Sequence, residues 1–347
     1  MDASETGPVS SNREAASYRP ALLLSRRDIA GIMSLEDYLS AVEGGFRAYR
    51  NGDADVPMPM HIPAPHGGFH AKSARLVLDR TYVALKLNGN FPGNPERNGL
   101  PTIQGVVVLC DGNDGSVLAV MDSIEVTLRR TAAATALAAR YLAPANARTL
   151  AICGCGAQGR AQLEALAAVL PLQRVFAWDL DAGKAKRFAR DMAQGLRLEV
   201  DPVPDIADAA RSSNVIVTAT TARAPFLDED MVRAGTFVAA VGADSSEKSE
   251  LEPALMGGAK IVVDLLAQAV TMGDLHHAID DGAVTVDDVH AELVDVIMGR
   301  KPGRTREDEI IVFDSTGTAI QDVASAVAIW KRALAGNAGS PMQFGAL

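Results

Sequence analysis

The chain has 347 residues, 48% of them hydrophobic and 22% charged, which is ordinary for a globular protein long enough for two domains. The formal net charge of −10 argues against a nucleic-acid or anionic-membrane partner, which would need a basic face. Three cysteines form neither a disulfide framework nor a metal-ligand pattern, and no apolar run reaches the ~18 residues that span a bilayer. We therefore expect a cytoplasmic protein without a bound metal, a nucleic-acid partner or a membrane partner.

The first part of the chain mixes helices and strands. Residues 1–18 are small and polar, which is typical of a disordered leader. A short strand at residues 21–24 precedes two helices, for which Ser25 and Ser34 are suitable N-cap residues. Residues 53–68 are rich in proline and cannot be helical throughout. The second helix has an apolar stripe, which consists of Tyr38, Leu39, Val42, Phe46 and Tyr49.

Residues 69–122 are expected to form strands and turns. Alternating polarity over residues 83–88 predicts a strand. Residues 105–111 and 117–122 flank a Gly-Asn-Asp-Gly turn, which is a strong hairpin signal. Asp122 then opens a long alanine-rich helix that extends to about residue 143.

From Arg148 onwards strands alternate with helices, which predicts a parallel sheet with helical crossovers. Two further helical stretches are expected at residues 272–279 and 286–298. A strand at residues 309–314 and a final helix at residues 317–335 follow. The strands of the alternating region are expected at residues 149–154, 174–179, 214–218, 236–241 and 261–265.

These elements predict an α/β protein in which a Rossmann-type parallel sheet domain is joined to a smaller, discontinuous α+β domain. The final helix has an apolar stripe of its own, so we expect it to return to the N-terminal part of the chain. The expected division is a Rossmann domain at residues 131–309 and a second domain at residues 19–130 plus 310–347.

The sequence Gly154-Cys155-Gly156-Ala157-Gln158-Gly159 is the clearest functional motif. It follows a strand of buried type and opens a helix, which is the context of a dinucleotide-binding turn. Gly154 permits the tight turn, Gly156 lets the backbone approach a pyrophosphate, and Gly159 allows close packing of helix on strand. Free N–H groups at Ala157 and Gln158 would meet the phosphates. A Rossmann-like domain that binds no dinucleotide is the alternative.

Asp179 ends the second strand of this region, 25 residues after Gly154. A carboxylate there would accept hydrogen bonds from the ribose hydroxyls. Asp179 could instead only cap the next helix. The neighbouring Asp181 adds negative charge where NADP carries its phosphate, so the expected cofactor is NAD, with NADP disfavoured.

Several segments resemble the ornithine cyclodeaminase/mu-crystallin family, and they cover most of residues 20–335 in order. The resemblance implies an enzyme that exchanges hydride between a nicotinamide and the α-carbon of a small amino or imino acid. It also implies a homodimer joined through the non-Rossmann domain, which would bind the substrate. The matching segments are residues 86–88, 91–95, 99–105, 121–122, 128–133, 154–158, 240–244 and 312–317.

The resemblance assigns the main chemistry to three residues. It places Lys86 beside the substrate, and a lysine at the end of an apolar strand is costly to bury without a partner, although it could snorkel outwards. It makes Arg130 the clamp for the substrate carboxylate and leaves Arg129 for a surface ion pair. Asp244 follows a strand and is implied as the general acid or base at the substrate nitrogen, with helix capping as its alternative.

The resemblance also implies contacts with weaker signals. Thr102 would touch the carboxylate or the cofactor, or serve only as a turn hydroxyl. Thr131 would lie at the cofactor. The turn of Ser315, Thr316 and Gly317 would approach the nicotinamide, although Ser315 or Thr316 could simply cap the last helix.

The chain departs from the family pattern at two points. Residues 58–60 are Met-Pro-Met where the family often has an arginine that grips the carboxylate. His70 and Lys72 lie near the position of a glutamate in ornithine cyclodeaminases, where a carboxylate would suit a second amino group. Lys72 could replace the missing arginine and His70 could donate a proton, or each could be structural. Ornithine is therefore disfavoured as the substrate.

Three functions remain open. The first is an NAD-dependent amino-acid dehydrogenase or ketimine reductase. The second is a cyclodeaminase, in which NAD is regenerated within each turnover and ammonia is released. The third is a ligand-binding protein like mu-crystallin. The acidic pair Asp179 and Asp181 disfavours it, as does the presence of Lys86, Arg130 and Asp244.

Overall fold

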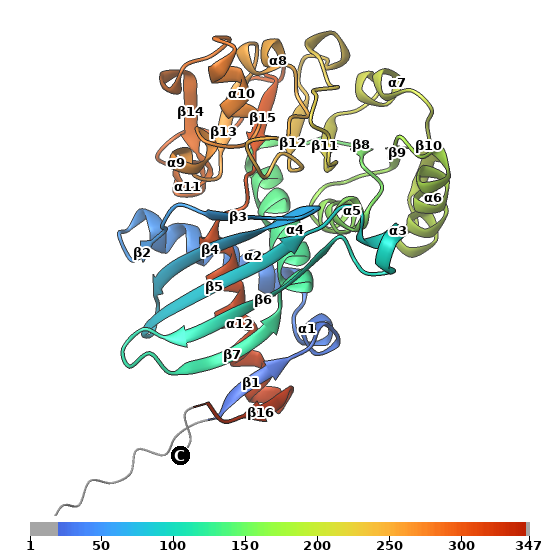
Figure 1. Ribbon diagram of the computed structural model, residues 1–347. Coiled ribbons are helices and arrows are strands. Elements are labelled where there is room, and N and C mark those ends of the chain that lie inside the picture. The colour runs from blue at the N-terminus through green and yellow to red at the C-terminus, as the bar shows by residue number, and fades with distance from the viewer. Residues whose placement is uncertain (1–19, 345–347) are drawn as a thin grey trace, which may run out of the picture.

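The computed structural model describes residues 20–344, so the leader expected at residues 1–18 lies outside the described residues. The chain forms two eight-stranded sheets with helices packed around them (Figure 1). No helix between residues 20 and 344 combines the length and the apolar character that a membrane span requires.

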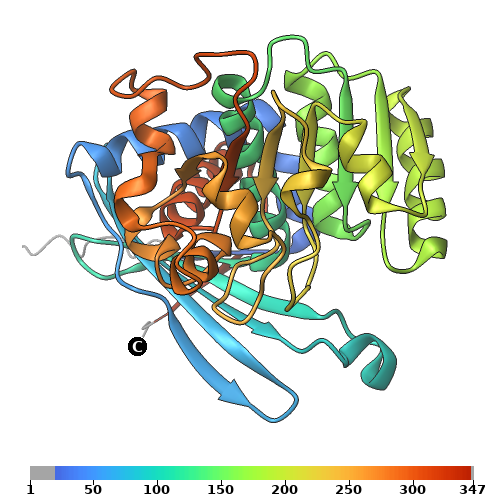
Figure 2. The ribbon, with the colours of Figure 1, turned by 90° about the horizontal axis from the view of Figure 1, so that it is seen from above.

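The first sheet is mostly antiparallel. Its strands are β1 (Ala21–Leu24), β2 (Ala54–Asp55), β3 (Met60–Ala64), β4 (Gly67–Val77), β5 (Thr81–Asn90), β6 (Ile103–Asp111), β7 (Val117–Asp122) and β16 (Ser340–Met342). They follow the order β16-β1-β7-β6-β5-β4-β2, and β3 also pairs with β4. Within residues 20–344, only β1 and β7 are parallel neighbours in this sheet. The β3–β4 hairpin and the β5–β6 pair with α3 (Asn94–Asn98) project from the body of the molecule (Figure 2).

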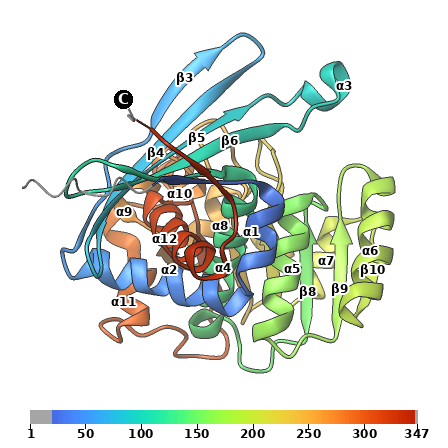
Figure 3. The ribbon, with the colours of Figure 1, turned by 90° about the horizontal axis from the view of Figure 1, so that it is seen from below.

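One face of the first sheet carries helices and the other does not (Figure 3). The helices are α1 (Arg26–Ile32), α2 (Leu35–Arg50), α4 (Ser123–Leu142) and α12 (Ala319–Gly336). As expected, side chains of Ser25, Ser34 and Asp122 cap the first three. Helix α12 packs against α2, α4, β4 and β5, so the end of the chain returns to its beginning as the apolar stripe predicted.

The second sheet is wholly parallel, which confirms the fold class. Its strands are β8 (Thr149–Cys153), β9 (Arg174–Trp178), β10 (Glu199–Pro202), β11 (Val215–Thr218), β12 (Phe237–Ala240), β13 (Lys260–Val263), β14 (Val289–Glu292) and β15 (Ile311–Asp314). The order is β10-β9-β8-β11-β12-β15-β13-β14, which reverses between β8 and β11. In open α/β sheets the crevice at such a reversal, outside the carboxyl ends of the strands, is the usual ligand site.

Shorter helices connect the strands of the second sheet. They are α5 (Ala157–Val169), α6 (Ala182–Leu196), α7 (Ile206–Arg211), α8 (Pro253–Gly257), α9 (Leu266–Ala269), α10 (Asp274–Asp280) and α11 (Leu293–Ile297). The helix predicted at residues 286–298 is confirmed only at its two ends, residues 286–288 and α11, because residues 289–292 pair with β13 as an edge strand. Pairing with a neighbouring strand overrides local propensity. Strand β10 was not predicted, since it contains one apolar residue, Val200, and ends in Pro202.

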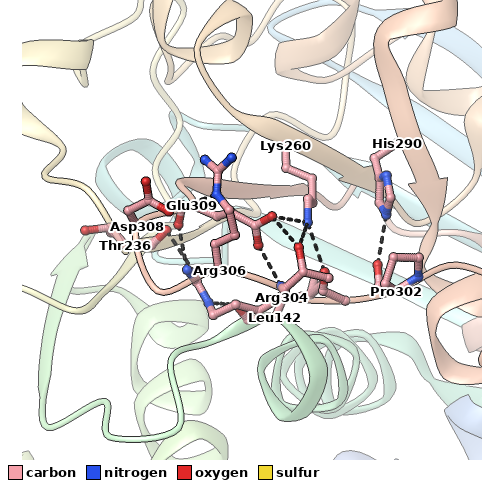
Figure 4. A network of polar contacts seen from close by, with 11 residues as sticks. Leu142, Thr236, Lys260, His290, Pro302, Arg304, Arg306, Asp308 and Glu309 are labelled. Carbon is pink, nitrogen blue, oxygen red and sulfur yellow. Dashed lines mark hydrogen bonds and ion pairs between the residues drawn. The ribbon is translucent and has the colours of Figure 1, made fainter.

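Polar contacts hold a loop at residues 299–309 against residues near the amino ends of β12 and β13 (Figure 4). Lys260, at the start of β13, donates to Glu309 Oε1 at 2.6 Å. Although burial acts against it, hydrogen bonds from Lys260 and Thr305 lower the pKa of Glu309 to about 2. Arg304 donates to three main-chain oxygens, which belong to Leu142, Thr236 and Glu309.

We predict that Glu309→Gln lowers the unfolding midpoint at pH 7 and has little effect near pH 2. The folded pKa lies below the ordinary value of 4.5, so the stabilisation is full above that pH and is lost as the pH falls towards about 2. The shift corresponds to at most about 3 kcal/mol. Thermal unfolding followed by circular dichroism measures it. Glu307→Gln on the same loop, where the side chain is exposed, should change neither midpoint.

Candidate active site

A cavity of about 220 Å³ lies where the carboxyl ends of β11, β12 and β15 meet β4, β5 and α4. It adjoins a second cavity of about 480 Å³ beside the β3–β4 hairpin. Four charged or titratable residues line both cavities, namely His70, Lys72, Asp244 and Lys248. The position matches the crevice expected from the strand order, with one wall contributed by each sheet.

The wall of the smaller cavity contains polar side chains that have no partner in the described part of the chain. Each has a buried oxygen or nitrogen without a hydrogen bond, and these residues are Asn88, Asn90, Thr127, Gln158 and Ser315. Buried polar atoms in native proteins are nearly always satisfied. The cavity therefore has the character of a site for a polar ligand.

A buried ion triad forms the floor of this cavity. Lys86 Nζ lies 2.7 Å from Asp322 Oδ2, and Arg130 Nε lies 2.9 Å from Asp322 Oδ1. Arg130 also donates to Gln321 Oε1 at 2.7 Å. Burial and the adjacent Arg130 lower the pKa of Lys86 to about 7, although Asp322 opposes them. One carboxylate thus serves two basic groups, and an anion bound beside them would favour the charged form of Lys86.

Lys72 lies directly opposite Lys86 in the β4–β5 pairing. Like charges at such a position repel one another, so each lysine needs its own partners. Lys72 Nζ donates to the main-chain oxygens of Gly317 at 2.7 Å and Thr316 at 3.1 Å, and its burial lowers its pKa. Two of its three N–H groups are therefore used by the turn after β15, and one is left for a ligand.

Asp264 fixes the turn after β15 through two hydrogen bonds. Asp264 Oδ2 accepts the N–H of Gly317 at 2.7 Å, and Oδ1 accepts the hydroxyl of Thr316 at 2.9 Å. Gly317 has a φ of +73°, and a Cβ there would lie 2.7 Å from Arg130 Nη1, so only glycine fits. Neither Ser315 nor Thr316 caps the last helix, whose N-cap residue is Thr318.

Asp244 lies in the loop after β12 and lines the same cavity as Lys86 and Arg130. Its Oδ1 accepts a hydrogen bond from Lys248 Nζ at 2.6 Å, and its side chain is half exposed. Partial burial acts to raise the pKa of Asp244, but the charges of Lys248 and Lys72 hold it below the ordinary value. Asp244 caps no helix in the described chain. It is a carboxylate that is ionised at neutral pH and open to a ligand.

Of the remaining predicted substrate residues, one reaches the cavity and one does not. His70 lies on β4 and stacks on His61 of β3, with ring centroids 4.6 Å apart, and its pKa is lowered by burial and by His61. Thr102 lies just before β6 and is not part of the cavity wall. Its main-chain oxygen accepts the N–H of Phe91 at 2.8 Å.

The glycine-rich turn has the geometry that a pyrophosphate requires. Gly154 has a φ of +106°, and a Cβ there would lie 2.5 Å from Ala219 O. A Cβ at Gly159 would lie 2.1 Å from Gly154 O, so the helix can approach the strand only with glycine. Gly156 faces open space, and no side chain caps α5, which leaves its first N–H groups available. The turn fits a dinucleotide.

Asp179 lies beside this turn but does not cap the following helix. Its Oδ2 accepts the N–H of Cys155 at 2.9 Å, and its Oδ1 accepts the N–H of Asp181 at 2.9 Å. The N-cap of α6 is Asp181, which accepts the N–H groups of Gly183 and Lys184. Asp179 therefore joins the end of β9 to the glycine-rich turn, and the carboxylate keeps further lone pairs for a ribose.

Most of the residues predicted from the sequence line this one cavity. They are Lys86, Arg130, Lys72, His70, Asp244, Thr131, Gln158 and the turn after β15. It missed the residues that hold them. Asp322 and Gln321 lie on the apolar final helix, where buried polar residues were a signal that could have been followed. Asp264 gave no comparable signal, since it contacts a turn more than 50 residues away. Lys248 lies four residues after Asp244 in the same loop, and that spacing was a signal that could have been followed.

Residues 20–337 match the ornithine cyclodeaminase/mu-crystallin family. The alanine dehydrogenase of Archaeoglobus fulgidus is 39% identical over 324 residues, which is 93% of this chain and 98% of that protein. The structure of an archaeal alanine dehydrogenase dimer with bound NAD has a TM-score of 0.88 at 38% identity, and covers 93% of this chain and 99% of that one. A Thermococcus litoralis Δ1-pyrroline-2-carboxylate reductase in complex with NADH and L-proline has a TM-score of 0.88 at 30% identity, over 92% and 100%.

We predict that Asp322→Asn lowers the free energy of unfolding by about 3–5 kcal/mol, because it leaves Lys86 and Arg130 buried without an anion. Asp79→Asn is the matched control, since Asp79 forms an ion pair at the surface with Lys331, which lies on α12 like Asp322. That change should cost less than about 1 kcal/mol. Denaturant unfolding measures both, and equal effects would contradict the role given to the triad.

Proposed function

Because this chain belongs to the ornithine cyclodeaminase/mu-crystallin family, we propose that it is an NAD-dependent oxidoreductase acting at the α-carbon of a small amino or imino acid. The supporting observation is that Lys86, Arg130 and Asp244 line one cavity at the strand edge that carries the glycine-rich turn. An anion clamp and a proton acceptor in one cavity are what hydride exchange at such a carbon requires.

The substrate carboxylate binds to Arg130 and Lys86, whose charges exceed that of Asp322. The third N–H of Lys72 adds to this grip. Asp244 is ionised and accepts a proton from the substrate nitrogen during oxidation, then returns it during reduction. His70 contacts the part of the substrate that extends into the second cavity. Thr102 has no substrate contact in this arrangement, because it is absent from the cavity wall.

NAD is the cofactor of this proposal, and when bound its nicotinamide accepts or donates the hydride. The glycine-rich turn would hold the pyrophosphate, and Asp179 would accept hydrogen bonds from the ribose hydroxyls. The negative charge of Asp181 disfavours NADP. Gln158 at the start of α5 and the turn after β15 both line the cavity, so they would hold the nicotinamide end of a bound NAD. The proposed contacts are Gly154, Gly156, Ala157, Gln158, Asp179, Thr131, Ser315, Thr316 and Gly317.

A cyclodeaminase is the alternative that the family itself includes. Such an enzyme must hold a second amino group of the substrate. Here the strand position where a carboxylate would suit that group has His70 and Lys72, and both cavities receive cations from Lys72 and Lys248. These charges favour a dehydrogenase or an imine reductase.

A substrate panel tests the proposal. Amino acids are offered with NAD and cyclic imines with NADH, and both NADH absorbance and ammonia are measured. We expect one class to give a stoichiometric change in NADH. Ammonia without net NADH would identify a cyclodeaminase, and tight NADH binding without turnover would identify a ligand-binding protein. In the active assay, Asp244→Asn should lower kcat by at least about 100-fold with little change in NADH affinity.

The proposal also includes a homodimer, and it assigns the cofactor and the substrate to separate domains. Residues 131–309 would bind the dinucleotide, and residues 19–130 with 310–347 would bind substrate and join the subunits. The helix-free face of the first sheet supports this, because it exposes apolar side chains on neighbouring strands. These side chains are Val83, Leu85, Leu87 and Val106. A continuous apolar sheet face marks an interface.

We predict that Leu85→Asp converts the dimer to a monomer, because a carboxylate at the centre of an apolar interface cannot be solvated. Light scattering coupled to size-exclusion chromatography measures the mass. Leu180→Asp is the control, since Leu180 is 92% exposed and lies in the second sheet's half of the chain. A wild-type monomer, or a dimer that survives Leu85→Asp, would contradict the proposed interface.

A further inference from the structure

Glu250 is a fully buried carboxyl that the proposed chemistry does not use. Its Oε1 accepts the N–H of Thr220 at 2.7 Å and the hydroxyl of Thr220 at 2.6 Å. Its Oε2 accepts the N–H of Gly242 at 2.8 Å. Thr220 follows β11 and Gly242 follows β12, and both line the smaller cavity. One carboxyl thus ties together two loops of the candidate site.

Both loops lead to functional groups. The loop after β11 packs against the glycine-rich turn, because a Cβ at Gly154 would lie only 2.5 Å from Ala219 O. In the loop after β12, the N–H of Asp244 donates to Gly242 O at 3.0 Å. A continuous series of contacts therefore runs from the dinucleotide turn, through Glu250, to Asp244.

Packing alone does not account for a carboxyl at this place. Glu250 forms no ion pair within residues 20–344, and burial together with the nearby Asp274 raises its pKa to about 7. A buried carboxyl without a cation is costly, and an apolar side chain would fill the space at a lower cost. The chain also has glycine at 242, where a Cβ would lie 2.4 Å from Glu250 Oε1. Gly242 thus leaves room for the carboxyl of Glu250, although an apolar side chain at 250 would give a larger free energy of unfolding.

We propose that Glu250 is a positioning residue that sets the place of Asp244 relative to the dinucleotide turn. The proposal rests on the function given above. Glu250 acts through Thr220 and Gly242, because its oxygens contact those two residues and no part of the cavity's ligand space. Its two oxygens accept from both loops at once. A glutamine has a single acceptor oxygen, so its amide N–H₂ would face the N–H of one loop and drive that loop away.

The test compares Glu250→Gln with Glu292→Gln. Glu292 is also a mostly buried carboxylate that accepts a main-chain N–H, that of Leu266 at 2.9 Å, and it is not part of either cavity. We expect Glu250→Gln to lower kcat by about 10-fold or more, while KM and the NADH dissociation constant stay within about 3-fold. Glu292→Gln should leave all three constants near the wild-type values.

A second variant covers the case in which Glu250→Gln does not fold. Gly242→Ala places a methyl group against the carboxyl and should lower kcat in the same way. If both variants fold, the double variant should be no slower than the slower single one, because both disturb one contact. Additive losses would overturn the proposal, and so would an unchanged kcat, a change in KM alone or an equal loss in Glu292→Gln.

Amide hydrogen exchange separates this inference from the proposed function. A wild-type chain that turns over no substrate contradicts the proposed function, and the inference is then judged on exchange. Residues 219–222 and 241–244 should exchange faster in Glu250→Gln, or in Gly242→Ala if that variant alone folds, and not in Glu292→Gln. Unchanged exchange in these loops would overturn the inference whether or not the enzyme is active.

Discussion

The carboxylate of Asp322, held between Lys86 and Arg130, is the interaction on which the candidate site depends. Two cations next to each other inside a protein are stable only if an anion is buried with them. The three residues lie on β5, α4 and α12, so the last helix has to return to the first sheet for the triad to form. The return of α12 to the first sheet is therefore required by the electrostatics of the site as well as by packing.

The same reasoning explains which ligand the cavity suits. Lys72, Lys86, Arg130 and Lys248 bring four basic side chains to it, and Asp244 and Asp322 bring two carboxylates with lowered pKa values. The excess is positive and lies on the first sheet's side. The second sheet contributes main-chain N–H groups and the carboxylate of Asp244. In the proposed function, the substrate charge and the coenzyme phosphates would thus be bound by different halves of the chain.

The fold was predictable to the extent that its signals are local. Alternating strands and helices after Arg148, the glycine-rich turn and the caps at Ser25 and Ser34 each depend on a few neighbouring residues. Edge strand β14 was not predictable in this way, because its four residues are set by pairing with β13. Lys86, Arg130 and Asp244 were found through family resemblance, whereas Asp322 and Asp264 act across separations of 192 and 53 residues, beyond the reach of any motif. Thr102 was predicted at the site through the same resemblance, and the path of the chain before β6 leaves it outside the cavity wall.

The ten-residue pairing of β4 with β5 limits which mutations this protein can tolerate in these two strands. Side chains alternate between the two faces of a strand, so Lys72 and Lys86 point to the cavity while Leu85 and Leu87 point to the bare apolar face. Deletion of one residue from the middle of either strand would exchange the faces beyond that point. Lysine side chains would then enter the proposed subunit interface, and leucine side chains would enter the candidate site. Insertions and deletions should therefore be confined to the hairpin tips, while these strands vary only by substitution.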